Sequence, residues 1–418
     1  MAKILCLECT LCGRRHPYDP GLHVCPACGE QGVLDVRYDY DAIARTFTKA
    51  TLAADPDRTM WRYLPLLSIV GDGHERTLRT GFTPLYRATR LGADLGLDVL
   101  YVKDEGVNPT ASMKDRASAV AVLDALALGA RTVACSSTGN AASSLAGQAA
   151  RMGLSSVIFV PRRAPVGKLN QLLAYGSTVI MVDGDYKAAF DLSKRAIRHY
   201  GWYDRNAAIN PHLVEGKKTM SLEIAEQLGW DVPDWAVVAV GDGCTVAGLY
   251  KGFYDLFRLG FTNRIPKILG VQASGCRPFV DAWEQNEPLR EAEEDTIADS
   301  IAVGIPRNPV KAMRAVRDSG GTWISVPDEE ILAMMKDLGR TEGIFGEPAG
   351  VAGLAGLKAA VARGLVKKGE SVVCAMTGNG LKDPANAARA VGSPILLKPD
   401  LEALIDYIDR HHAEVHAQ

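Results

Sequence analysis

The feature that most constrains the fold of this 418-residue chain is an alternation of short β-rich runs with helical patterns from about residue 98 onward. Helical patterns such as AASSLAGQAARMG (141–153) lie between most of these runs. The runs cover residues 98–105, 132–137, 156–161, 178–183, 235–240, 268–273 and 371–376. Strands that alternate with helices pair in parallel, and near-continuous apolar strands indicate sheets covered on both faces. We therefore expect an α/β fold built on open parallel sheets.

Length and charge exclude several classes of protein. A chain of 418 residues is long for a single core, so we expect two or more domains. The formal net charge is −2 without a strongly basic block, which argues against a nucleic-acid partner. No apolar run reaches the length of a membrane span. Nine cysteines in a chain of this size do not indicate a disulfide framework, and we expect a soluble, cytoplasmic protein.

Five of the nine cysteines fall within the first 28 residues. Cys9-x2-Cys12 and Cys25-x2-Cys28 are separated by twelve residues, and a glycine follows each pair. Glycine permits the tight turn that points both thiolates of a pair at one ion, so the pattern predicts a closed, structural four-thiolate zinc site. Metal-free thiols are the alternative, and Cys6 is a spare thiol that can compete as a ligand. Such a segment can also be an interaction module, so it does not decide the function.

The stretch NPTASMKDR (108–116) places Lys114 in the first turn of an expected helix. Helix starts favour acids because their unpaired N–H groups carry partial positive charge, so a lysine there is mildly misplaced. Ser112 and Asp115 have the spacing of a capping box. Lys114 is therefore either an ordinary exposed lysine or an amine whose pKa is lowered for covalent chemistry.

Three further loops follow expected strands, where α/β sheets bind ligands. The loop 135–143 offers Ser137, Thr138, Gly139 and Asn140 at a helix N-terminus, which suits either an anion such as a substrate carboxylate or simple helix capping. The loop GDGCTVAG (241–248) lacks the glycine spacing of a dinucleotide site and suits a single phosphate. The loop MTGNGLKD (376–383) adds hydroxyl and amide groups. A candidate reactive lysine with a one-phosphate loop predicts pyridoxal phosphate as cofactor.

These motifs resemble the threonine synthase family of fold-type II pyridoxal-phosphate enzymes. NPTASMKDR is similar to the family's NPTGSFKDR, and SSTGNAASSLAGQAARMG is similar to its asparagine loop. INPHLVEGKKTMSLEIAEQLG, EEILAMMKDLGRTEGIFGEPAGVAGLAGL and MTGNGLKDP follow the family's order and spacing. The resemblance implies two α/β domains with the cofactor between them. It also implies a homodimer that acts on a small amino-acid substrate.

The resemblance implies a role for each motif. Lys114 forms the Schiff base and moves protons at Cα and Cβ, Asn140 meets the cofactor's 3′-oxygen, and Thr377 meets its pyridine nitrogen. The cofactor-phosphate loop consists of Gly241, Asp242, Gly243, Cys244 and Thr245. The substrate is bound by Ser137, Thr138, Gly139 and Lys217. In the family reaction, phosphate leaves O-phospho-L-homoserine and water adds at Cβ, which gives L-threonine.

The chain departs from the family pattern NSxNPxRxEGQK, whose Asn, Ser and Arg bind the substrate phosphate. Ala207, Ala208 and Leu213 occupy those positions, Lys217 replaces Gln, and Asn379 replaces the family's histidine in TGHGLKD. Either another cation binds the phosphate or the substrate has none. The candidate cations are Lys217, Lys168 and Arg307. Without a phosphate, the enzyme is a related lyase or β-replacement enzyme on a different amino acid.

The motifs divide the chain into expected segments. Residues 1–38 form the zinc-ribbon-like segment, 39–117 with 207–400 the large cofactor-binding domain, 118–206 the small domain, and 401–418 a C-terminal helix or tail. A different class of function, an interaction protein with an inactive enzyme-like domain, is disfavoured because Lys114, Asn140 and Thr377 are all present.

Overall fold

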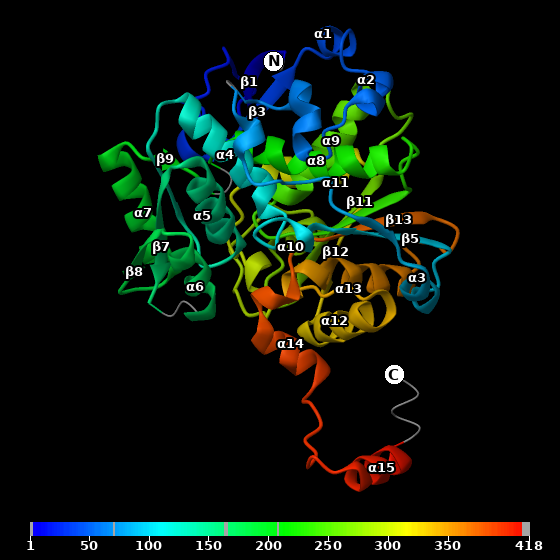
Figure 1. Ribbon diagram of the computed structural model, residues 1–418. Coiled ribbons are helices and arrows are strands. Elements are labelled where there is room, and N and C mark those ends of the chain that lie inside the picture. The colour runs from blue at the N-terminus through cyan, green and yellow to red at the C-terminus, as the bar shows by residue number, and fades with distance from the viewer. Residues whose placement is uncertain (1–2, 70–71, 163–165, 207–208, 412–418) are drawn as a thin grey trace.

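A computed structural model describes residues 3–69, 72–162, 166–206 and 209–411 (Figure 1). Within these residues the strands form three sheets with helices packed around them. All seven β-rich runs that we expected from the sequence are strands. The two larger sheets are parallel apart from one edge strand, which confirms the α/β expectation.

The largest sheet has six strands, and strands from distant parts of the chain lie side by side in it. In order across the sheet they are β12 (Thr322–Val326), β11 (Lys267–Ala273), β10 (Trp235–Ala239), β13 (Ser371–Met376), β5 (Val99–Asp104) and β4 (Leu85–Arg87). β4 pairs antiparallel with β5 at one edge. Because β5 and β13 are neighbours, the loops that follow them lie side by side at the carboxyl edge of the sheet.

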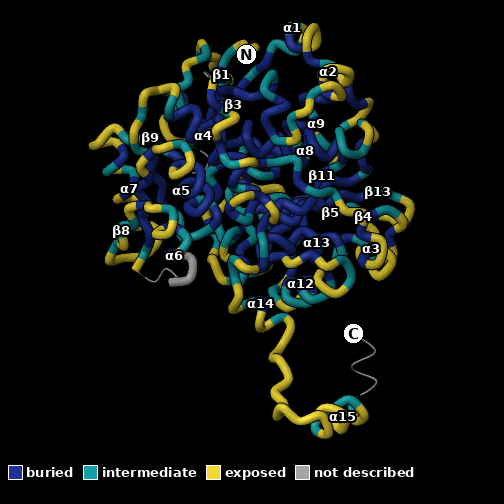
Figure 2. The backbone as a smooth tube through the Cα atoms, in the orientation of Figure 1, coloured by how far each residue is buried: buried dark blue, intermediate teal, exposed yellow. Residues whose placement is uncertain are grey.

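Alternate residues of the central strands enter two separate hydrophobic cores. Ala236 and Val238 of β10 pack on one face, and Val237 and Ala239 pack on the other. The helices on the first face are α8 (His212–Gln227), α9 (Cys244–Arg258), α10 (Pro278–Gln285) and α11 (Pro309–Asp318). Those on the second face are α3 (Thr89–Leu95), α12 (Asp328–Glu342), α13 (Pro348–Ala362) and α14 (Pro384–Val391). Figure 2 shows the sheet as buried backbone between these layers.

The second sheet has four parallel strands. Their order is β8 (Thr178–Val182), β7 (Ser155–Pro161), β6 (Thr132–Ser136) and β9 (Tyr203–Asp204). The helices α5 (Asn140–Met152) and α6 (Val166–Ala174) cover one face, and α7 (Tyr186–Tyr200) covers the other. The helix α4 (Lys114–Ala127) packs against both α5 and α8, and it spans the boundary expected at residue 117. The domain boundaries themselves stay a prediction.

The N-terminal segment forms a small antiparallel sheet. Its strands, in order, are β2 (Arg15–His16), β1 (Ile4–Cys9) and β3 (Leu34–Tyr38). Leu7, Leu34 and Val36 are fully or almost fully buried in the same core as α8 and α9. The segment is therefore packed onto the large sheet's helices. The short helices α1 (Tyr40–Ala44) and α2 (Lys49–Ala54) follow it.

The chain ends in an extended arm. Residues 391–400 are exposed throughout, and α15 (Leu401–Arg410) lies away from the body of the molecule (Figure 2). No helix in the described part of the chain is long and apolar enough to cross a membrane.

Candidate active site

The lysine loop and the loop after β13 are paired by backbone hydrogen bonds. The backbone N–H of Met113 donates to the carbonyl oxygen of Thr377 at 2.9 Å, and that of Asn379 donates to Ala111 at 3.0 Å. Ser112 and Gly378 form an isolated antiparallel bridge between these two contacts. Since β5 and β13 are neighbours, this pairing follows from the sheet order, and it brings Lys114 and Thr377 together.

The helix α4 begins at Lys114, as expected, but the predicted capping box is wrong. Met113 is the N-cap, and no side chain caps it. The hydroxyl of Ser112 accepts only a long contact from the backbone N–H of Lys114, at 3.3 Å. Asp115 is buried and instead accepts from the backbone N–H and the hydroxyl of Thr110, both at 2.9 Å. Asp115 therefore closes the loop that precedes Lys114.

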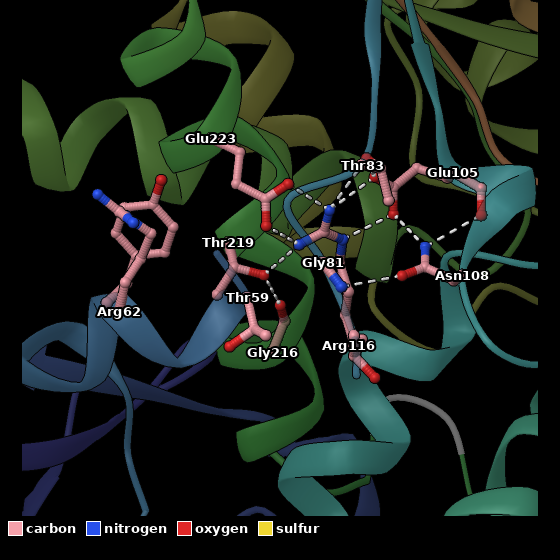
Figure 3. Close-up of polar contacts among 12 residues, drawn as sticks. Thr59, Arg62, Gly81, Thr83, Glu105, Asn108, Arg116, Gly216, Thr219 and Glu223 are labelled. Atoms are coloured by element: carbon pink, nitrogen blue, oxygen red, sulfur yellow. Dashed lines mark hydrogen bonds and ion pairs between the residues drawn. The ribbon is translucent and has the colours of Figure 1, made fainter. Parts of the chain in front are cut away.

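Arg116 anchors the first turn of α4 in a network of buried charges (Figure 3). Its guanidinium forms a two-pronged contact with Glu105 at 2.6 and 2.7 Å, and a second one with Glu223 at the same distances. Nη1 also donates to Thr219 at 2.8 Å. Lys103 donates to Glu223 at 2.9 Å. We call Lys103, Glu105, Arg116 and Glu223 the Arg116 network. It ties the residue two positions after Lys114 to the residue that follows β5 and to α8.

Lys114 lies near two cations, Lys217 and Arg205, and near the carboxylate of Glu347. The pKa of Lys114 is lowered to about 8, chiefly by burial and also by the charges of Lys217 and Arg205, while the charge of Glu347 opposes this shift. The expectation of a lysine with a lowered pKa agrees with this direction. The cause differs, because removal from water and neighbouring cations act here besides the helix start. A larger fraction of the amine is neutral near pH 8 than for an ordinary lysine.

Asn140 begins α5, which covers the four-stranded sheet, and reaches across to Glu347, the N-cap of α13 on the six-stranded sheet. Its Nδ2 donates to Oε1 of Glu347 at 2.6 Å, and the backbone N–H of Glu347 donates to the carbonyl oxygen of Gly378 at 2.9 Å. Asn140 is thereby tied to the loop that carries Thr377. Asn140 and Thr377, which the sequence assigned to the cofactor, lie at one site with Lys114.

The glycine loop 241–243 joins β10 to α9. Gly243 is the N-cap of α9 at φ +87°, and a Cβ atom there would lie 2.8 Å from both the Cβ of Ala312 and the carbonyl oxygen of Asn308. Only glycine fits this conformation and this space. The first N–H groups of α9, at Cys244 and Thr245, have no carbonyl partner within the helix. N–H groups at such a position, at the end of β10, are suited to an anion.

Asp242 in this loop is held by a neighbouring segment. Its carbonyl oxygen accepts from Asn308 at 3.0 Å, and its Oδ1 lies 3.7 Å from Nη1 of Arg307. The guanidinium of Arg307 also lies over the ring of Phe190, 4.1 Å from its centroid, so Arg307 lies between the glycine loop and α7.

The loop 137–139 after β6 lies close to the glycine loop. A Cβ atom at Gly139 would lie 3.6 Å from Oγ of Ser300, and one at Gly241 would lie 3.0 Å from the Cα of Ile301. Both loops thus face the same short segment. Oγ of Ser137 accepts from the N–H of Gly139 at 3.2 Å, and Ser137 and Thr138 are half-buried.

Lys217 is buried on α8, and its Cβ is 3.0 Å from the position a Cβ would take on Gly248 of α9. Burial lowers the pKa of Lys217, and Arg205 lowers it further. Nε of Arg205 donates to Ser118 at 3.1 Å, while its Nη2 is buried without a hydrogen-bond partner among the described residues. Within the described part of the chain, Lys217 and Arg205 have no carboxylate in ion-pair contact. An anion would compensate two buried cations in this state.

Two residues that depart from the family pattern, Leu213 and Asn379, have clear structural roles. Leu213 is 1 % exposed and belongs to the core of the four-stranded sheet. Oδ1 of Asn379 accepts from the backbone N–H of Leu381 and caps the short helix over 380–382. Ala207, Ala208 and the side chain of Lys168 lie outside the described residues.

The four cysteines that we expected to bind a metal form one cluster. The Sγ atoms of Cys9, Cys12, Cys25 and Cys28 all lie within 4.8 Å of one another. The glycine after each pair has positive φ, +70° and +61°, as the tight turns require. Cys6 lies outside this group.

Comparisons with known proteins assign this chain to a family. A model of the pyridoxal-phosphate dependent enzyme family matches residues 76–378. The chain is 40% identical over 405 residues to a threonine synthase of Methanosarcina acetivorans, covering 96% of this chain and 98% of that protein. It is 39% identical over 400 residues to a threonine synthase of Methanocaldococcus jannaschii, covering 95% and 98%.

This chain belongs to the threonine synthase family of pyridoxal-phosphate-dependent enzymes. The fold agrees with solved structures at lower identity. A threonine deaminase from Solanum lycopersicum superposes with a TM-score of 0.65 at 21% identity, over 81% of this chain and 93% of that one. A diaminopropionate ammonia lyase from Escherichia coli gives 0.66 at 19% identity, over 76% and 89%.

The residues present fit the family's cofactor. Lys114 supplies an amine of lowered pKa, and the start of α9 supplies N–H groups for a single phosphate. Sequence reasoning missed Glu347, Arg205 and the Arg116 network. Glu347 lies within GIFGEPAG, which follows the family order, but nothing local in that motif shows its contact with Asn140.

Proposed function

We propose that this chain is a threonine synthase that converts O-phospho-L-homoserine and water into L-threonine and phosphate, with pyridoxal phosphate as cofactor. One observation carries the proposal. Lys217 and Arg205 are buried cations without carboxylate partners in the described residues, and both act on the pKa of Lys114. A phosphorylated substrate supplies the negative charge that such a site lacks.

Each group of this site has a part in the proposed reaction. Lys114 holds the cofactor and then, as a free amine, moves protons at Cα and Cβ of the substrate. Removal of a proton at Cβ allows the bond from Cγ to the phosphate oxygen to break, and water then adds at Cβ. Lys217 and Arg205 bind the phosphate that leaves. Ser137, Thr138 and Gly139 bind the substrate carboxylate at the start of α5.

The remaining residues position the cofactor. The N–H groups around Gly241, Asp242, Gly243, Cys244 and Thr245 bind its phosphate. Asn140 binds its 3′-oxygen with the hydrogen that Nδ2 does not give to Glu347, and Thr377 lies at its pyridine nitrogen. When bound, the cofactor stabilises negative charge on the substrate's reacting carbons.

A second candidate is a lyase that acts on a hydroxy amino acid without a phosphate. The observation in its favour is Leu213, an apolar core residue at the position of the family's phosphate-binding arginine. To separate the two, the purified holoenzyme is assayed with O-phospho-L-homoserine, L-serine and L-threonine in parallel. We expect phosphate and threonine from the first substrate only. Deamination of serine or threonine without phosphate release would support the second candidate.

We also propose that the four-cysteine cluster binds one structural zinc ion and that the protein is a cytoplasmic homodimer. Four thiolates within 4.8 Å of one another, in a segment with little core of its own, support the zinc.

The family resemblance supports the dimer, and sedimentation equilibrium tests it. A mass of about twice that of one chain is expected, and a monomer at working concentration would contradict it.

A further inference from the structure

Three metal-ligand side chains meet at a second place in the molecule, away from both the four cysteines and Lys114. One nitrogen or oxygen atom of each of His23, Asp124 and His212 lies within 4.8 Å of the other two. They come from three separate parts of the fold: the N-terminal segment, α4 and the first residue of α8. Asp124 and His212 are fully buried, and His23 is half-buried.

The contacts of these residues leave ligand atoms free at one point. Nε2 of His23 and Oδ1 of Asp124 are buried without a hydrogen-bond partner among the described residues. Nε2 of His212 is 3.9 Å from Oδ2 of Asp124, which is too long for a hydrogen bond. The rings of His23 and His212 meet edge to face, with centroids 6.1 Å apart. The three groups are thus gathered without bonding to one another.

The surroundings orient two of the three ligands. Nδ1 of His212 lies 2.7 Å from the hydroxyl of Ser68, and without an ion Nε2–H donates to the carbonyl oxygen of Pro20 while Ser68 donates to Nδ1. In the other tautomer Nδ1–H donates to Ser68 instead, and the lone pair of Nε2 is then available to an ion. Oδ2 of Asp124 accepts from the hydroxyl of Tyr203 at 2.6 Å, which fixes the carboxylate and leaves Oδ1 available. The carbonyl oxygen of Pro20, 3.4 Å from Nε2 of His212, is a further oxygen donor beside the group.

The charges at this point also favour a cation. Asp124 is a buried carboxylate, and no lysine or arginine in the described residues forms an ion pair with it. A buried carboxylate without a lysine or arginine partner is costly even with the hydrogen bond from Tyr203, and a divalent ion compensates its charge. Two imidazole nitrogens with one carboxylate oxygen form a donor set that zinc takes with one further ligand.

We propose that His23, Asp124 and His212 form a second zinc site that fastens the N-terminal segment to α4 and α8. Both helices carry proposed active-site residues, Lys114 on α4 and Lys217 on α8. The ion bridges three parts of the chain, so its effect is to hold the segment against the helices that build the active site. The site does not depend on the proposed reaction.

Zinc content per chain tests this proposal, measured by inductively coupled plasma mass spectrometry on the full-length holoenzyme. The variants are His23→Gln and Asp124→Asn, and the matched control is His199→Gln on the exposed surface of α7. We expect each site variant to hold about one zinc ion fewer per chain than the wild type, and the control to match the wild type. An equal zinc content in the wild type and both site variants would overturn the proposal.

A second measurement does not depend on how well the variants fold. The metal-free wild-type protein is titrated with Co²⁺, since cobalt bound by thiolates gives charge-transfer absorption and cobalt bound by nitrogen and oxygen does not. We expect the cobalt to fill two sites. Cobalt at the four cysteines gives thiolate charge-transfer absorption, and cobalt at the second site adds only ligand-field absorption. If all absorption changes end once the thiolate charge-transfer band is saturated, no second cobalt ion binds, and the second site would be overturned.

Discussion

Nδ2 of Asn140 donates a hydrogen bond of 2.6 Å to Oε1 of Glu347, across 207 residues of sequence. The same glutamate binds the loop of Thr377 through its backbone, since its N–H donates to Gly378 at 2.9 Å. Glu347 thus fixes which end of the Asn140 amide points into the site. The asparagine is positioned by the residue that precedes α13, a helix of the six-stranded sheet, so its orientation depends on how the two larger sheets are placed.

Replacement of Asn140 by alanine removes the hydrogen bond that we assign to the cofactor's 3′-oxygen. A hydrogen bond to a charged group contributes about 1.5–3 kcal/mol, so kcat is expected to fall by about ten- to 150-fold. The visible absorption band of the bound cofactor is expected to remain, because Lys114 still holds it. Steady-state kinetics and an absorption spectrum check this. A kcat within about twofold of wild type would show that Asn140 has no such contact.

The pH dependence of cofactor attachment reports the pKa of Lys114. The neutral amine is the reactive form, so the attachment rate of the apo-protein rises with pH through about 8 rather than through the ordinary lysine value near 10.4. Removal of the positive neighbour in Lys217→Gln raises the pKa of Lys114 and moves the midpoint to higher pH. Glu347→Gln removes a negative charge and moves it to lower pH. Stopped-flow absorbance measures all three, and shifts in the same direction for both variants would contradict the assignment.

Lys217→Gln shows which phosphate Lys217 binds, that of the substrate or that of the cofactor. If it binds the substrate phosphate, KM for O-phospho-L-homoserine rises about ten- to 150-fold while the affinity for pyridoxal phosphate changes little. Kinetics and cofactor titration of the same preparation give both values. A lower affinity for pyridoxal phosphate with an unchanged KM would instead place Lys217 at the cofactor phosphate, beside α9.

Replacement of Arg116 by methionine leaves Glu105 and Glu223 without their guanidinium partner. Removal of one member of a buried charge pair costs about 3–5 kcal/mol, so the free energy of unfolding is expected to fall by that amount. Denaturant unfolding measures it. The control is Lys187→Ala, whose side chain is 82% exposed in its pair with Asp191, and it is expected to leave the free energy of unfolding nearly unchanged. Equal effects of the two substitutions would contradict the role of the Arg116 network.

Cys25→Ser and Cys28→Ser test the zinc of the N-terminal segment. Each is expected to lose about one zinc ion per chain and to weaken the packing of β1 and β3 on α8 and α9, because the segment has little core of its own. Zinc analysis and limited proteolysis follow both effects, with Cys6→Ser as the matched control that keeps its zinc. Unchanged zinc in Cys25→Ser would reject the four-cysteine site.

Local sequence patterns predicted the parts of the fold that depend on local signals. All seven expected strands are present because each is a continuous apolar run followed by small or polar residues. The strand β12, TWISV, was missed because its five residues mix polar and apolar types without a clear period. The antiparallel strands of the N-terminal segment were missed because the cysteine spacing indicates turns and not pairing.

The site was predictable where a motif carries its own chemistry. Lys114, Asn140 and the glycine loop stand in recognisable strand-end loops, whereas Glu347 and Arg205 act through contacts between distant parts of the chain. The capping box failed for a related reason. Asp115 has the right spacing from Ser112, but Thr110 offers it two hydrogen-bond donors in a buried loop.

The most direct test of the account is the stoichiometry of products from O-phospho-L-homoserine. The purified holoenzyme is incubated with the substrate, and phosphate and threonine are measured in the same samples, with Lys114→Ala as control. We predict one threonine for each phosphate released by the wild type, and neither product above background from the variant. Substrate left intact by a fully loaded holoenzyme, or phosphate released without threonine, would contradict the proposed function.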